Sequence, residues 1–126
     1  MEDTRDIIAE IIGDISSIGY KDLRGVVALA AERDIDGVEY LQMGTILGEY
    51  EKMTGRKAQT VSKSLGRITA IMWESGNRDV FRELYQGHLP STCPSPKSLV
   101  IRLAYFERRR KRQMKDVPNA LVLGPV

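Results

Sequence analysis

The side chains best able to do chemistry in this chain are cations and hydrogen-bonding groups gathered between residues 56 and 67. On a helical wheel centred on Val61, they form the side opposite the apolar stripe and its flanks. The polar members are Arg56, Gln59, Thr60, Ser62, Lys63 and Arg67. Cations one turn apart can bond guanine edges or adjacent phosphates, glutamine can pair with adenine, and hydroxyls can bond phosphate. The pattern predicts hydrogen bonding to nucleic acid in a major groove.

Nucleophiles and metal ligands are scarce. Cys93 is the only cysteine and His88 the only histidine, so the chain forms no internal disulfide and lacks a zinc ligand set. A Cys-His or Ser-His pair would have to use these single residues, on either side of a Pro-Ser-Thr stretch. We therefore expect no enzyme activity, no catalytic residue, no metal and no cofactor, and a reducing cytoplasm as the compartment.

The composition fits one globular domain. With 126 residues, 42% hydrophobic and 29% charged, the chain is long enough to bury its own core. Its longest apolar run, Val26 to Ala31, is far shorter than a membrane span. The acidic first residues do not resemble a secretory signal. We expect no membrane contact.

Charge is divided unevenly along the chain. Residues 1–54 carry 5 basic and 12 acidic side chains, a net charge of −7, whereas residues 55–126 carry 14 and 5, a net of +9. A basic half suits a polyanion such as nucleic acid. The alternative is that the two halves form solvated surfaces of opposite charge that bind no partner. The run "RRRKR", Arg108 to Arg112, also has two interpretations. Its cations either contact phosphates or lie in solvent at the C-terminal end of a helix, where the helix dipole stabilises positive charge.

Hydrophobic spacing predicts helices from one end of the chain to the other. Isoleucines between residues 7 and 15 indicate a helix over residues 4–16, which "SIGY" ends at Gly19. The same spacing predicts helices over residues 21–33, 58–75, 77–85 and 96–114. Residues 38–53 fit either one helix or a short helix and a second one divided near Gly44. No segment shows the alternation of a long strand. The expected fold class is all-α, a compact bundle of about six helices with a central helix-turn-helix.

Three segments are expected: an acidic amphipathic helix over residues 1–18, a helix-turn-helix domain over 19–115, and an extended tail over 116–126. Residues 44–75 have the helix-turn-helix layout, with Gly55 in the short turn. Gly66 costs the second helix about 1 kcal/mol relative to alanine. As a small outward residue, it would let the backbone approach DNA closely.

Three stretches follow one another in a recognisable order: "SIGYKDLRGVV", "TVSKSLGRITAIMWESGNRDVFRELY" and "CPSPKSLVIRLA". Together they resemble the C-terminal DNA-binding effector domain of the sporulation initiation response regulator of endospore-forming bacteria. The matching positions are Gly19, Tyr20, Leu23 and Arg24 in the first stretch, then Trp73, Gly76, Asn77 and Asp79 in the second. A Lys-Pro-rich loop and an apolar last helix follow. The resemblance covers roughly residues 17 to 110.

The resemblance implies a six-helix domain that binds double-stranded DNA at promoter sites as tandem dimers, with the last helix contributing to a homodimer contact. It also has limits. Where the family recognises bases with an Arg-x-Glu-Arg cluster, this chain has Thr60, Ser62 and Lys63, and a lysine does not replace a bidentate arginine. Only about 18 residues precede the matched region, so we expect no phosphorylatable receiver domain. The N-terminal helix either packs on the core, mediates dimerisation or covers a basic surface.

We expect a cytoplasmic, sequence-specific DNA-binding transcription regulator that places the helix of residues 58–75 in the major groove. The residues expected to contact DNA are Arg56, Lys57, Gln59, Thr60, Ser62, Lys63, Arg67, Arg108, Arg109 and Arg110. The alternative is a protein-interaction module that keeps the effector fold, has lost base recognition, and pairs with a related regulator through its first or last helix.

Overall fold

The computed structural model describes residues 6–13, 17–32 and 42–123, with side chains placed as far as Arg109. Its helices are α1 (Ile7–Ile12), α2 (Ile18–Glu32), α3 (Met43–Thr54), α4 (Ala58–Ser75), α5 (Arg78–Leu84) and α6 (Pro96–Leu123). The described residues contain no strand, which confirms the all-α prediction. None of the described helices is long and apolar enough to cross a membrane.

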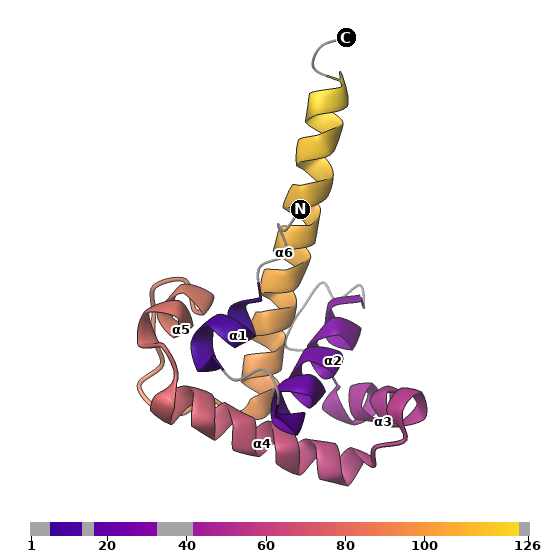
Figure 1. The fold of residues 1–126 in the computed structure, drawn as a ribbon, viewed down its shortest axis with the longest axis vertical. Coiled ribbons are helices and arrows are strands. Elements are labelled where there is room, and N and C mark those ends of the chain that lie inside the picture. Colours follow the sequence, from indigo (N-terminus) through magenta and orange to yellow (C-terminus); the bar gives the residue numbers. More distant parts are fainter. Residues whose placement is uncertain (1–5, 14–16, 33–41, 124–126) are drawn as a thin grey trace.

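Helix α2 lies at the centre and packs against α6, α4 and α3. Figure 1 shows α4 along one edge of the body, while the C-terminal part of α6 leads away from the opposite edge. The core consists of apolar side chains from all six helices. Leu23, Val26, Val61, Leu99 and Val100 are among its fully buried members. Helix α4 is thus held by one face and leaves its other face free.

The first helix is shorter than predicted. It begins after Asp6, whose carboxylate accepts a hydrogen bond from the Ala9 N–H, and ends at Gly13, which has a φ of 78°. The prediction that Gly19 ends this helix is wrong, because Gly19 lies inside α2. A Cβ at Gly19 would lie 3.2 Å from the Ile68 Cβ, so close packing of α2 on α4 explains this glycine. The predicted residues 4, 5 and 14–16 lie outside the described residues.

Helix α1 packs on the core, the first of the three roles considered for it. Ile7, Ile8 and Ile11 are buried in the common core, and the Ile11 carbonyl accepts a hydrogen bond of 2.8 Å from the Asn77 N–H. Helix α1 is therefore fixed to the junction between α4 and α5.

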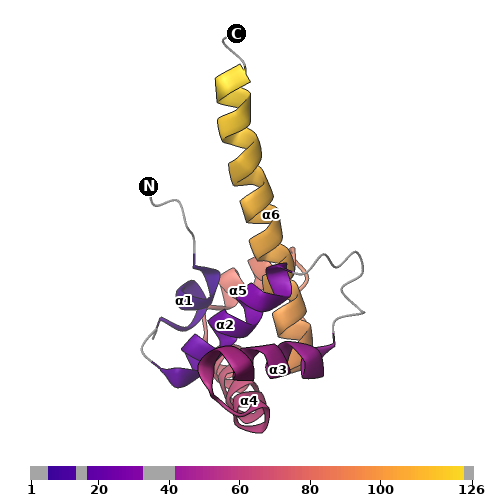
Figure 2. The same cartoon turned by 90° about the vertical axis from the view of Figure 1, so that its right-hand side faces the viewer.

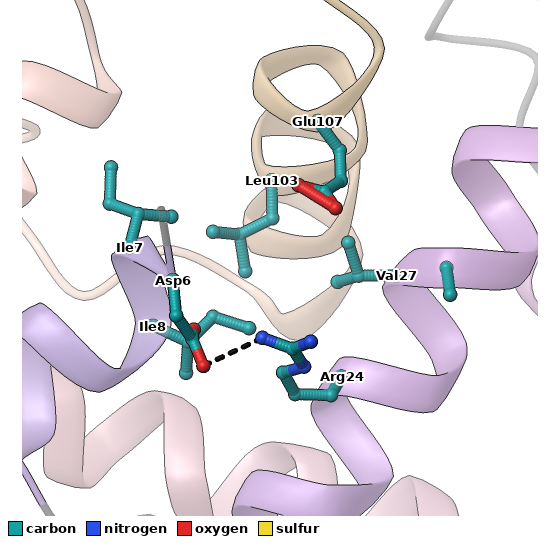
Figure 3. Close-up of a pocket in the computed structure, with 8 residues that line it drawn as sticks. Asp6, Ile7, Ile8, Arg24, Val27, Leu103 and Glu107 are labelled. Carbon is teal, nitrogen blue, oxygen red and sulfur yellow. Dashed lines mark ion pairs between the residues drawn. The ribbon is translucent and has the colours of Figure 1, made fainter. Parts of the chain in front are cut away.

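Asp6 adds a polar anchor between α1 and α2. Its Oδ2 lies 2.6 Å from Nη1 of Arg24 (Figure 3) and also accepts a hydrogen bond from the Tyr20 hydroxyl. Tyr20 and Arg24 belong to the first stretch that carries the family resemblance. In this chain they hold the N-terminal helix in place.

Helix α6 begins as predicted and ends later. The Ser95 hydroxyl accepts a hydrogen bond of 3.1 Å from the Ser98 N–H, so Ser95 caps the helix and Pro96 takes its first position. The predicted extended tail from residue 116 is wrong for residues 116–123, which continue α6 to Leu123. Residues 107–115, "ERRRKRQMK", are nearly all strong helix formers and carry α6 as far as residue 116. Pro118 has no backbone N–H, so the part that follows lacks one intrahelical bond.

Candidate nucleic-acid interface

Helices α3 and α4 form the predicted helix-turn-helix, joined by the three residues 55–57. Figure 2 shows α3 lying across α4, which is seen end-on. Gly55 has a left-handed φ of 79°, and its N–H donates a hydrogen bond of 2.8 Å to the Glu51 carbonyl. Glycine adopts this conformation without steric strain, which allows the tight turn.

Side chains hold this turn from both sides. The Thr54 hydroxyl donates to the Tyr50 carbonyl (2.8 Å) and accepts from the Arg56 N–H (3.2 Å). The Glu51 carboxylate accepts a hydrogen bond of 3.0 Å from the Ala58 N–H and so satisfies the first amide of α4. Lys57, at the N-cap position, gives no side-chain bond to the helix. The start of α4 therefore has a fixed direction relative to α3.

Helix α4 has one buried and one exposed face. The buried residues are Val61, Leu65, Ile68, Thr69 and Met72. Thr69 satisfies its hydroxyl within the helix, by donating to the Leu65 carbonyl at 2.7 Å. The residues predicted for base or groove contact are all exposed: Gln59, Thr60, Ser62, Lys63 and Arg67. The structure thus presents them together on the side away from the core.

The exposed face is basic in its first turns. No described residue forms a hydrogen bond or ion pair with the side chain of Lys57, Lys63 or Arg67, and all three are exposed. The sole acidic residue of α4 is Glu74, in its last turn. Together with the positive end of the helix dipole, these cations favour a polyanionic ligand at the N-terminal half of α4.

Arg56 has a different environment from the other predicted cations. Its Nε and Nη2 donate hydrogen bonds to Oδ1 (2.9 Å) and Oδ2 (2.7 Å) of Asp22, a fully buried residue of α2. The Tyr50 hydroxyl donates a third bond, of 3.0 Å, to Oδ1. Hydrogen bonding to Asp22 raises the pKa of the Arg56 guanidinium, while burial, followed by Asp22, raises the pKa of Tyr50 to about 12. Arg56 therefore stays charged and Tyr50 stays protonated at neutral pH.

Asp22 is not among the residues predicted from the sequence. A signal was available, because Asp22 lies one turn before Val26 and so falls on the buried face of its helix. Gly25 is part of the same arrangement, since a Cβ there would lie 2.3 Å from Cε1 of Tyr50. The missing side chain leaves room for the Tyr50 ring against α2.

The second set of predicted phosphate contacts lies elsewhere. Arg108 is half-buried, Arg109 is exposed with its guanidinium carbon 5.7 Å from the centre of the Tyr105 ring, and the Arg110 side chain lies outside the described part. This segment of α6 leads away from the edge formed by α4 (Figures 1 and 2). The two cationic sets do not form one surface, and a duplex docked on α4 would lie on the other side of the body.

Gly66 lies on the exposed side of α4, and a Cβ placed on it would have nothing within 4 Å. We expect Gly66→Ala to raise the free energy of unfolding by about 0.5–1 kcal/mol, because alanine restricts the unfolded chain and favours the helix. Urea unfolding followed by circular dichroism measures this change. A loss of stability would mean that other residues pack against Gly66 and leave no room for a methyl group.

No His, Cys, Asp or Glu side chains among the described residues form a group of three or more that could hold a metal ion. Comparisons with family models, curated proteins and solved structures found nothing that matches this chain. The resemblance to the sporulation effector domain therefore stays a prediction.

Proposed function

We propose that this chain is a sequence-specific DNA-binding transcription regulator that places the exposed face of α4 in the major groove. The observation that carries the proposal is the pair Lys63 and Arg67, which lie one turn apart on the exposed face of a helix fixed by a three-residue turn. A helix presented in this way is the part of a helix-turn-helix that enters the groove.

Each residue of the face has an assigned role. Lys63 and Arg67 bond base edges, with Gln59 as a further base contact. Thr60, Ser62 and Lys57 bond phosphates beside the groove. Gly66 leaves the helix backbone open to close approach. The target sequence differs from that of the family, because Thr60, Ser62 and Lys63 replace its Arg-x-Glu-Arg cluster.

The proposal includes a homodimer in the cytoplasm. The support for it is α6, whose C-terminal part leads away from the body (Figure 1) and so provides a length of helix for a second copy. Two copies placed side by side would present two α4 helices to neighbouring half-sites.

Selection from a random duplex library tests the proposal, followed by affinity measurements on the selected duplex across a salt series. We expect one enriched motif and a log-log slope of about −0.9 for each phosphate contacted. A library with no enriched motif, bound with a flat salt dependence, would reject DNA recognition by this chain.

A second candidate function is the protein-interaction module that has lost base recognition. The observation in its favour is Ile71, which is 49% exposed on α4, one turn after Arg67. It would place the pairing surface on α4 and not on the first or last helix, as the sequence predicted. A protein partner would bury this apolar side chain, and removing apolar surface from water stabilises association. Loss of pairing in solution on Ile71→Ser, with DNA affinity unchanged, would favour this candidate.

A further inference from the structure

We propose that Asp22 is a positioning residue for DNA binding: it holds Arg56 so that the free edge of the guanidinium meets a DNA phosphate at the start of α4. This inference rests on the proposed function and adds to it a specific contact and the residue that aims it. Asp22 itself does not touch DNA.

The geometry fixes Arg56 along one edge. Nε and Nη2 are both bonded to the Asp22 carboxylate, at 2.9 and 2.7 Å, in the two-point arrangement that arginine makes with a carboxylate. A guanidinium is planar, so two bonds on one edge set the orientation of the whole group. No described residue accepts a hydrogen bond from the remaining nitrogen, Nη1.

The carboxylate that holds Arg56 is itself immobile. Asp22 has no exposed surface, and its two oxygens accept bonds from Nε and Nη2 of Arg56 and from the Tyr50 hydroxyl. Leaving a buried carboxylate without hydrogen-bond donors costs several kcal/mol of free energy, about the penalty for an unpaired buried charge. Rotation of Asp22 away from these donors is therefore strongly disfavoured. Because Gly25 has no side chain, the Tyr50 ring fits against α2 and its hydroxyl can reach Asp22.

Arg56 lies next to the start of α4, where DNA would dock, and its side chain reaches the surface there. The Arg56 side chain is 31% exposed, and it precedes the exposed Lys57 and the first turn of α4. The positive end of the helix dipole lies at the same place. A phosphate there meets an arginine that has already lost its freedom of rotation, so binding costs little side-chain entropy.

The arrangement also separates Arg56 from the other cations of the site. Lys57, Lys63 and Arg67 have no partner among the described residues and must be ordered by DNA. Arg56 is ordered by the protein, and its contact is the one that fixes the register of α4 on the duplex.

The test uses the full chain and its selected duplex, with affinity measured across a salt series. The variants are Arg56→Lys, Asp22→Asn and the double variant. The matched control is Arg24→Lys, which makes the same substitution in another arginine–aspartate pair, Arg24 and Asp6 at 2.6 Å, away from α4. Circular dichroism at the binding temperature verifies that each variant is folded. If Asp22→Asn does not fold, Arg56→Lys still tests the inference, because it keeps a cation beside the buried Asp22.

We expect Arg56→Lys to lower affinity about tenfold and to reduce the magnitude of the salt slope by about 0.9, the value for one phosphate contact. Asp22→Asn is expected to do the same, although it leaves every cation in place and removes an anion beside Arg56, because Arg56 is then no longer held in position. It should add nothing further in the Arg56→Lys background. Arg24→Lys should change neither quantity. This non-additivity distinguishes aiming of Arg56 from a general loss of stability.

An unchanged slope in Arg56→Lys, with a normal slope for the unaltered protein, overturns this inference and leaves DNA recognition standing. Independent, additive losses from Asp22→Asn and Arg56→Lys also overturn it. A flat slope for the unaltered protein rejects DNA recognition and this inference together.

Discussion

Replacing Lys63 and Arg67 together by alanine is expected to remove sequence preference and most of the affinity for the selected duplex. Each base contact of this kind contributes about 1–3 kcal/mol, so the loss is about 5- to 150-fold for each residue. Affinity for unrelated duplexes should fall less, because phosphate contacts support binding there. Lys63→Ala alone should relax the preference at one position of the site. Competition binding with the selected and a scrambled duplex measures both effects.

The control for this prediction is Arg82→Ala. Arg82 is an exposed cation on α5 whose partner is Asp79, at 3.6 Å, and it does not belong to the face of α4. Its removal changes the net charge without touching the proposed contacts, so it should leave sequence preference unchanged. If Lys63→Ala and Arg67→Ala behave like Arg82→Ala, the recognition face has been assigned to the wrong surface.

The second large effect is expected from Gly76→Ala, at the end of α4. A Cβ at Gly76 would lie 2.4 Å from the Met72 carbonyl oxygen and 2.6 Å from Cγ2 of Ile11. The chain must shift to admit it, which would strain the Asn77 to Ile11 bond that anchors α1. We expect the free energy of unfolding to fall by about 1–3 kcal/mol, the usual range for an overpacked site. Thermal and urea unfolding measure the change.

The comparison variant is Gly66→Ala, which makes the same change in the open part of the same helix and should stabilise the protein. Opposite signs at the two glycines would show that the Trp-x-x-Gly-Asn ending of α4 is a docking point for α1. Equal, small effects would contradict the close approach of Ile11 to Gly76.

Local sequence signals predicted the helix-turn-helix well. The apolar stripe from Ala58 to Met72 gave the bounds of α4, because the stripe has helical spacing and a turn follows it. Asn77 predicted the start of α5, and its carboxamide oxygen does accept bonds from the N–H groups of Asp79 and Val80. These features depend on residues a few positions apart, which a sequence displays directly.

Contacts between residues far apart in the sequence cannot be predicted from such local signals. Gly13 and Gly19 carry similar local signals, and only the packing of Gly19 against Ile68 decides that α2 continues through it. Asp22 and Arg56 are 34 residues apart, so nothing local marks them as partners. For this reason the sequence alone places Arg56 among the free cations of α4, although its position is fixed by the protein.

The most direct test of the central claim is an amide NMR titration of the labelled chain with the selected duplex. We expect the largest shifts and broadening to fall on residues 55–67, the turn and the first half of α4, with little change in α1 and α5. Changes confined to α6, or spread evenly over the chain, would contradict the claim that α4 enters the groove.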